Sequence, residues 1–183
     1  MDRNITLKLY NSSMGESLRT LSSRANVPIG FEALPEDGKS SRTINFHLRA
    51  SVREMLNRIV RPDRRYRWEL KDGVVNVMPQ ESAGNGLLDV VIQNVSLKDV
   101  DAEQLGTLIL DLPEVRAKLG ELGLTGSKTS EYDGPLRNLP VFSISKTHIV
   151  LRDLLNEVLR RGYTEYWIAM RYGDLNQYVA IRL

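Results

Sequence analysis

Two stretches of the chain repeat one pattern of apolar positions, about a hundred residues apart. Residues 52–60 read VREMLNRIV and residues 151–159 read LRDLLNEVL, and both place apolar residues at the first, fourth, fifth, eighth and ninth positions. This spacing puts one buried stripe on an amphipathic helix. We therefore expect two equivalent helices from an internal duplication, with Leu56 and Leu155 as equivalent core residues.

Alternating apolar and polar residues predict strands on both sides of each helix. They cover residues 43–48, 66–70 and 74–77 around the first helix, and residues 141–145, 166–170 and 178–183 around the second. Hairpin turns are expected at residues 71–73 and 172–174. Tyr66, Trp68 and Leu70 share one strand face, which we expect in the core. The equivalent face of the second copy would then carry Tyr166, Ile168 and Met170.

A second correspondence lies upstream, where residues 5–16 align with residues 88–99 at an offset of 83. Each segment reads as a strand that runs into a helix. Ser13 with Glu16, and Ser96 with Asp99, have the serine-x-x-acid spacing of a capped helix start. Both correspondences occur in the same order, which favours duplication over chance similarity.

The second copy is longer than the first, because the offset grows from 83 to 99 at the later helices. About 15 extra residues must therefore lie between positions 105 and 140. Pro113 can start an additional helix, with Val115, Leu119 and Leu122 on its buried side. The following stretch, residues 123–140, is rich in Gly, Ser, Thr, Asp and Pro and reads as an irregular loop.

These patterns predict an α+β protein with two tandem β-α-β-β-α-β units. Each unit would have two helices on its own small mixed or antiparallel sheet. We expect a first domain at residues 1–79, a linker at 80–87 and a second domain at 88–183; one continuous sheet through both halves, without a domain boundary near residues 80–87, would argue against the duplication. The chain is 42% hydrophobic and 26% charged, which is typical of a packed globular protein.

The first unit resembles the short N-terminal (STN) domain shared by secretins and TonB-dependent receptors. The family pattern is a strand, an N-x-S-[LM]-x-[ED] entry to a helix, a strand, and a strand–helix–hairpin with a D-G turn. Here it corresponds to residues 5–9, 11–16 with Leu18 and Leu21, 27–31, 43–48, 51–60 and 66–77. The resemblance covers residues 5–79 well and the second half loosely. It implies a small periplasmic domain that binds other proteins and has no enzyme activity, and it does not identify the partner.

No catalytic, cofactor or metal site is predicted. The chain has no cysteine and two histidines, His47 and His148, without the spacing of a metal site. Both histidines are interpreted as surface residues. The glycines at 120–126 lack the ending of a phosphate-binding loop and read as helix stops. Glu36 and Asp37 are interpreted as solvated turn residues. We therefore expect a protein that is not an enzyme.

The strongest local feature is a basic segment in which Asp63 is the only acidic residue; the candidate partner-binding residues are Arg58, Arg61, Arg64, Arg65 and Arg67. Arginine side chains suit phosphates and acidic protein surfaces. A solvated turn at a helix end, where positive charge favours the helix dipole, is the alternative interpretation. Residues 1–80 carry 14 Lys and Arg against 9 Asp and Glu, net +5, whereas residues 81–183 carry 11 against 14, net −3.

Two functional hypotheses follow. The first is a non-enzymatic protein-protein interaction module of the bacterial cell envelope, periplasmic or otherwise exported, whose partner is acidic and bound at a strand edge. The second is a cytosolic nucleic-acid-binding protein that uses the basic first domain. No apolar run reaches the length of a membrane span, and residues after Met1 do not form a signal peptide. The sequence that precedes Met1 in the gene would discriminate between the two.

Overall fold

The computed structural model describes residues 1–35, 43–80, 86–127, 140–162, 164–172 and 178–183. The first half contains β1 (Asn4–Ser12), α1 (Met14–Ala25), β2 (Ile29–Glu32), β3 (Ile44–Ser51), α2 (Val52–Val60), β4 (Tyr66–Lys71) and β5 (Val74–Pro79). The second half contains η1 (Leu87–Asp89), β6 (Val91–Val100), α3 (Ala102–Leu110), α4 (Pro113–Glu121), β7 (Thr125–Gly126), β8 (Phe142–Val150), α5 (Leu151–Arg160), β9 (Tyr166–Tyr172) and β10 (Tyr178–Arg182). The predicted α+β class is confirmed.

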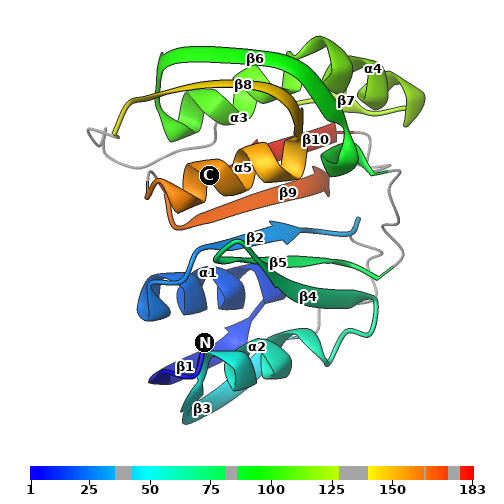
Figure 1. Ribbon diagram of the computed structural model, residues 1–183. Coiled ribbons are helices and arrows are strands. Elements are labelled where there is room, and N and C mark those ends of the chain that lie inside the picture. Colours follow the sequence, from blue (N-terminus) through cyan, green and yellow to red (C-terminus); the bar gives the residue numbers. More distant parts are fainter. Residues whose placement is uncertain (36–42, 81–85, 128–139, 163, 173–177) are drawn as a thin grey trace.

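One mixed sheet runs through both halves in the order β4-β5-β2-β9-β10-β7. The two halves meet where β2 and β9 pair in parallel, from Ile29 opposite Tyr166 to Glu32 opposite Ala169. Figure 1 shows these two strands side by side, with the first half of the chain below them and the second half above. The expectation of a separate sheet in each unit is therefore wrong. The division into two domains at residues 80–87 stays a prediction, and residues 81–85 lie outside the described part of the chain.

Two hydrophobic cores lie on opposite faces of this sheet. Ile29 and Phe31 point into the core that contains α1 and α2, with the partly buried Tyr166 and Ile168 packed against it. Trp167 and its neighbours on the same face point into the other core, which contains α3, α4 and α5. Because side chains alternate between the faces of a strand, both faces of β2 and β9 are covered. Strand β9 has apolar residues on both faces and is unsuited to a solvent-exposed sheet edge, which is a physical reason why the halves join at this strand.

The two halves share one strand topology. Each has an antiparallel ribbon, β1 with β3 and β6 with β8, in addition to three strands of the large sheet. Both ribbons change register near the end of their first strand. At that point Asn11 and Asp99 adopt positive φ angles of 49° and 52°. The backbone amides of these residues donate hydrogen bonds to Asn45 Oδ1 at 2.7 Å and to Ser143 Oγ at 3.1 Å, respectively.

This equivalence corrects the upstream alignment. Ser96 lies within strand β6 and does not cap a helix. The N-cap equivalent to Ser13 is Asp101, and each forms a capping box, with Glu16 and with Gln104 respectively. The offset is therefore 88 (from 13 to 101) rather than 83, and it becomes 99 at the N-caps of α2 and α5 (from 51 to 150). The difference, 11 residues, replaces the expected 15 or so.

The two repeated helices are confirmed. All five apolar positions of each stripe are buried, and Leu56 and Leu155 are both 0% exposed. Ser51 caps α2 by accepting a hydrogen bond from the Glu54 amide at 3.2 Å. The extra helix is confirmed as α4, with Pro113 in its first turn. Strand β7 was not predicted, because two residues are too short to show a periodic pattern; residues 128–139 of the expected loop lie outside the described residues.

Candidate binding surface

The basic segment runs from the last turn of α2 into β4, and the structure pairs some of its arginines internally. Arg58 contacts Glu54 on α2 at 3.3 Å. The Arg65 guanidinium donates to the Asp63 carboxylate at 2.7 Å, and Arg67 contacts the Glu69 carboxylate at 3.1 Å. These three arginines are thus partly neutralised by their neighbours along the chain.

Arg61 and Arg64 differ from the other three arginines. Both are exposed, and neither forms an ion pair with another residue in the part of the chain that the structure describes. Arg61 caps the C-terminal end of α2, where its backbone amide donates to the Asn57 carbonyl at 3.0 Å. The positive charge that residues 61–65 can offer to a partner therefore comes from the Arg61 and Arg64 side chains.

The second half shows why the end of α2 is basic. In α5 the residue equivalent to Arg58 is Glu157, which contacts Arg160 at 2.6 Å and Arg161 at 2.9 Å. Hydrogen bonding from Arg160 above all lowers the pKa of Glu157 from 4.5 to about 2, with Arg161 and Lys146 adding to the effect. Because α2 has an arginine at position 58, it lacks the carboxylate that pairs with the arginines at the end of α5. The charge reversal at this one position therefore leaves Arg61, the equivalent of Arg160, without an acidic neighbour on its own helix.

Strand β4 forms one edge of the large sheet. It pairs with β5 along residues 66–71 and with no other strand among the described residues. Leu70 on this strand is 49% exposed, so its expected place in the core is wrong. Tyr66 is buried, as expected, and burial raises its pKa. The unpaired N–H and C=O groups along such an edge can accept a further strand.

The indole of Trp68 is half-buried at this edge. Its Nε1 donates to Asn57 Oδ1 at 3.1 Å, and the guanidinium carbon of Arg53 lies 5.7 Å from its ring centre. In the second half, Trp167 Nε1 donates to Asn156 Oδ1 at 3.0 Å. Trp68 and Trp167 are therefore equivalent at the same offset of 99 as the helices, which corrects the expected match of residues 66, 68 and 70 with residues 166, 168 and 170.

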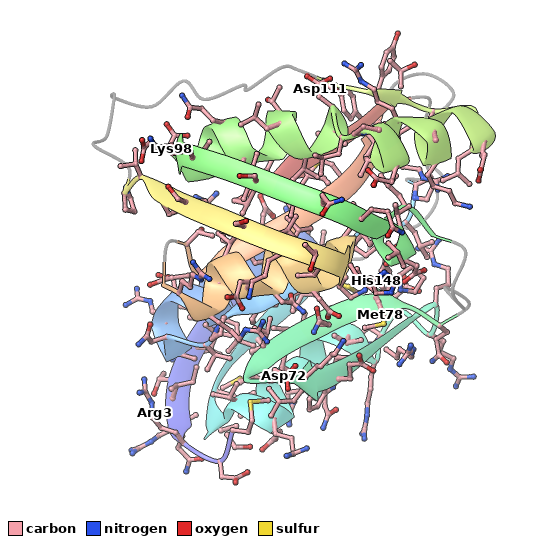
Figure 2. The ribbon with its side chains drawn as sticks, turned by 45° about the horizontal axis from the view of Figure 1, so that its top comes forward. Arg3, Asp72, Met78, Lys98, Asp111 and His148 are labelled. Atoms are coloured by element: carbon pink, nitrogen blue, oxygen red, sulfur yellow. The ribbon has the colours of Figure 1, made fainter. Side chains whose placement is uncertain are left out.

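Side chains of α5 connect the second half to the first. The Arg152 guanidinium donates to Glu32 at 2.6 Å, and Asn156 donates to the buried Asn76 side chain at 3.0 Å. Closer to the hairpin tip, Lys71 contacts Asp153 at 2.6 Å and Arg160 contacts Asp72 at 3.4 Å. Figure 2 places Asp72 at the tip of the β4–β5 hairpin, beneath α5.

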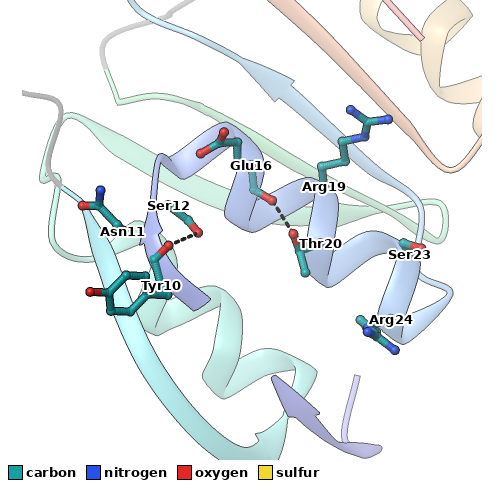
Figure 3. Close-up of a pocket in the computed structure, with 8 residues that line it drawn as sticks. All are labelled: Tyr10, Asn11, Ser12, Glu16, Arg19, Thr20, Ser23 and Arg24. Carbon is teal, nitrogen blue, oxygen red and sulfur yellow. Dashed lines mark hydrogen bonds between the residues drawn. The ribbon is translucent and has the colours of Figure 1, made fainter. Parts of the chain in front are cut away.

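A shallow polar groove of about 590 Å³ lies between the end of β1 and α1. Figure 3 shows the side chains that line it, which are Tyr10, Asn11, Ser12, Glu16, Arg19, Thr20, Ser23 and Arg24. Some of its polar atoms already have partners: Ser12 donates to the Tyr10 carbonyl and Thr20 to the Glu16 carbonyl. The Ser13 amide donates to the Glu16 carboxylate and lowers its pKa. Ligand pockets usually have an apolar lining that encloses the ligand, and this open groove does not.

Other candidate groups are placed as follows. His47 and His148 are exposed, as predicted, and His148 lies within β8 (Figure 2). Among the described residues, no group of three or more His, Cys, Asp or Glu side chains could hold a metal ion. Glu36 and Asp37 lie outside the described residues. In the part of the chain that the structure covers, none of the helices is long and apolar enough to cross a membrane.

Comparison of the chain with protein-family models, with curated proteins and with solved structures finds no match.

Proposed function

We propose that this chain is a non-enzymatic protein-protein interaction module that binds an acidic protein segment at the β4 edge of its first half. The observation that carries the proposal is the combination of the β4 edge, which is unpaired among the described residues, with two exposed arginines, Arg61 and Arg64, in the turn that leads into β4. The edge supplies main-chain hydrogen bonds to an added strand. The arginines supply a positive potential that steers an acidic segment towards it.

The resemblance of residues 5–79 to the STN domain supports a place in the bacterial cell envelope. Members of that family are periplasmic and bind other proteins, and we propose the same environment for this chain. The rival hypothesis remains a cytosolic nucleic-acid-binding protein that uses the basic first half. A signal sequence upstream of Met1 in the gene, or recovery of the full-length protein from periplasmic extract, would favour the envelope; recovery from cytosol alone would contradict it.

The binding proposal is tested by capture of partners on the whole chain, followed by association kinetics at two ionic strengths. The test variant is Arg61→Glu with Arg64→Glu, because neither arginine has an ion pair to lose among the described residues. We expect slower association and a weaker salt dependence, without a change in the free energy of unfolding.

The matched control is Arg19→Glu with Arg24→Glu, which makes the same charge change in the polar groove on α1. This control should retain most of the association rate. Equal rates for the wild type and the Arg61/Arg64 variant would contradict the proposal. Retention of RNA in preference to every protein would support the nucleic-acid hypothesis instead.

A further inference from the structure

The edge of β4 has an equivalent in the second half of the chain, and there a neighbouring strand is paired with it. In the second half, the equivalent strand β9 accepts β2 as a parallel neighbour. Gly30 lies opposite Trp167, and a Cβ atom at Gly30 would overlap the indole ring. Only a residue without a side chain fits beneath this tryptophan. The β2–β9 pairing therefore requires glycine at that one position.

Two residues further along β2, an acidic side chain completes the contact. Glu32 lies opposite Ala169, and its carboxylate accepts a hydrogen bond from Arg152 on α5 at 2.6 Å. The Arg152 side chain is 8% exposed and the Glu32 side chain 17%. Without a carboxylate at position 32, the shielded Arg152 guanidinium would lose this partner, and a buried charge without its partner strongly destabilises a protein. The pairing therefore favours an acidic residue at this position. Strand β2 thus presents the pattern Gly-x-Glu to the tryptophan and arginine of the second half.

The first half keeps the same tryptophan and arginine. Trp68 is equivalent to Trp167, and Arg53 is equivalent to Arg152 at the same offset of 99 residues. The hydrogen bond from each tryptophan to an asparagine on the repeated helix holds the two rings in corresponding positions. Trp167 is 0% exposed, whereas Trp68 is half-buried because no strand is paired with the outer edge of β4 among the described residues.

Arg53 also lacks the strong partner that Arg152 has. Among the described residues, its ion-pair partner is Asp2 at 4.0 Å, and the two side chains are 56% and 94% exposed. An ion pair at that distance and exposure contributes little. Arg53 is consequently available to a carboxylate brought by another chain.

We propose that β4 binds a partner strand in parallel, with glycine opposite Trp68 and an acidic residue opposite Leu70 that pairs with Arg53. The inference rests on the proposed function, and it specifies the orientation of the partner strand and a Gly-x-acid recognition pattern. The Trp68 ring closes over the glycine as the Trp167 ring does over Gly30.

The other face of β4 indicates what the remaining partner side chains must be. Arg67, Glu69 and Lys71 stand where the second half has Tyr166, Ile168 and Met170. Tyr166 and Ile168 pack against the core of the first half. The charged residues of β4 cannot pack against an apolar core of this kind. A partner strand that belongs to a sheet covered by helices, as β2 does, therefore does not fit. The partner is therefore an extended segment whose outward side chains are polar.

The probe is an acetylated and amidated eight-residue peptide, VPTGTEAL, which is residues 27–34 of this chain with Ile29→Thr and Phe31→Thr. Binding to the whole protein is followed by NMR of the two indole N–H groups, assigned with Trp68→Phe. We expect the Trp68 signal to shift in a saturable manner while the Trp167 signal stays in place. A second peptide that carries a nitroxide label in place of the acetyl group should broaden amide signals near Tyr66 more than those near Lys71.

Three changes test the recognition pattern. A peptide with valine in place of glycine, and one with lysine in place of glutamate, should each bind about tenfold more weakly or worse, a factor that corresponds to about 1.4 kcal/mol. Arg53→Glu should lose the glutamate peptide and gain the lysine peptide. Arg49→Glu, the same charge change on β3, should leave binding of the glutamate peptide nearly unchanged.

Absence of binding, equal affinity for all three peptides, or a shift of Trp167 in place of Trp68 would overturn this inference. None of these outcomes would contradict the proposed function if a captured protein still depends on Arg61 and Arg64. Conversely, peptide binding with no Arg61/Arg64-dependent protein would support the edge pattern and leave the proposed function refuted.

Discussion

Asn156 accepts a 3.0 Å hydrogen bond from the indole of Trp167, and this pair joins helix α5 to strand β9 inside the protein. The asparagine also donates to Asn76 of the first half at 3.0 Å. Three buried polar side chains thus satisfy one another across the junction of the two halves. The same tryptophan–asparagine pair in the first half, Trp68 with Asn57, lies at the open edge of the sheet instead.

Replacement of Asn156 should destabilise the protein more than replacement of Asn57. Asn156→Ala leaves the Trp167 indole N–H and the Asn76 side-chain oxygen buried without the partners that they have in the wild type, which costs about 1–3 kcal/mol for each group. Asn57→Ala frees only the half-buried Trp68 indole, which water can reach, so we expect a loss of about 1 kcal/mol or less. Urea unfolding of both variants measures the difference. Equal losses would mean that the junction network contributes nothing beyond the local pair.

A side chain at position 30 should disturb the joint between β2 and β9. Gly30→Ala places a methyl group against the Trp167 ring, and overpacking of this kind costs about 1–3 kcal/mol. Gly15→Ala is the matched control, because a Cβ there meets its nearest atoms at 3.6 Å. In the first turn of α1 the alanine should leave the free energy of unfolding unchanged or raise it by up to about 1 kcal/mol. If thermal unfolding shows the same change in stability for Gly30→Ala as for Gly15→Ala, the close contact between position 30 and the Trp167 ring would be contradicted.

The repeated helices should contribute similarly to stability. Leu56→Ala and Leu155→Ala each remove a side chain that is 0% exposed, and each should lower the free energy of unfolding by about 2–5 kcal/mol. Leu108→Ala, at a position that is 37% exposed, should cost less than about 1 kcal/mol. A loss below about 1 kcal/mol at both buried leucines would show that the stripes do not face the cores.

Acid should weaken the protein partly through Glu157. Its pKa is about 2 in the folded protein against an ordinary 4.5, so its contribution is fully present above about pH 4.5 and is lost as the pH falls towards 2. Because its ion pairs lie near the surface, we expect only about 1 kcal/mol. Glu157→Gln should therefore be less stable than the wild type at pH 7, with a gap that closes in acid. Glu121→Gln, which removes an exposed pair with Lys118, is the control and should show little gap at any pH.

Most helices and strands could be predicted, because stripes and caps are local features. Ser51 and Pro113 mark helix starts by their own chemistry, and the stripe around Leu56 is visible in nine residues. The continuous sheet could not be predicted in this way, since the parallel pairing of β2 and β9 joins residues far apart in the chain. Ser96 was misassigned because a serine-x-x-acid spacing also occurs inside a strand, as it does in β6.

The candidate site was predicted only in part. The arginines are evident from their spacing, but their separation into paired and unpaired side chains depends on Glu54, Asp63 and Glu69 in the folded chain. The Trp68 pair was missed, although a signal exists: an asparagine on each repeated helix is followed by a tryptophan 11 residues later in both halves. That spacing also gives the correct alignment of residues in β9 with the equivalent residues in β4.

Backbone hydrogen exchange, resolved to single residues in β4 and β9, tests the open edge most directly. In the protein alone, the β4 amides that do not bond to β5 should exchange nearly as fast as unprotected amides, whereas the β9 amides bonded to β2 should be protected. On addition of the Gly-x-Glu peptide, the edge-facing amides of β4 should slow while those of β9 stay as they were. Protection of the β4 edge before any partner is added would contradict the account, because the edge would then already be covered.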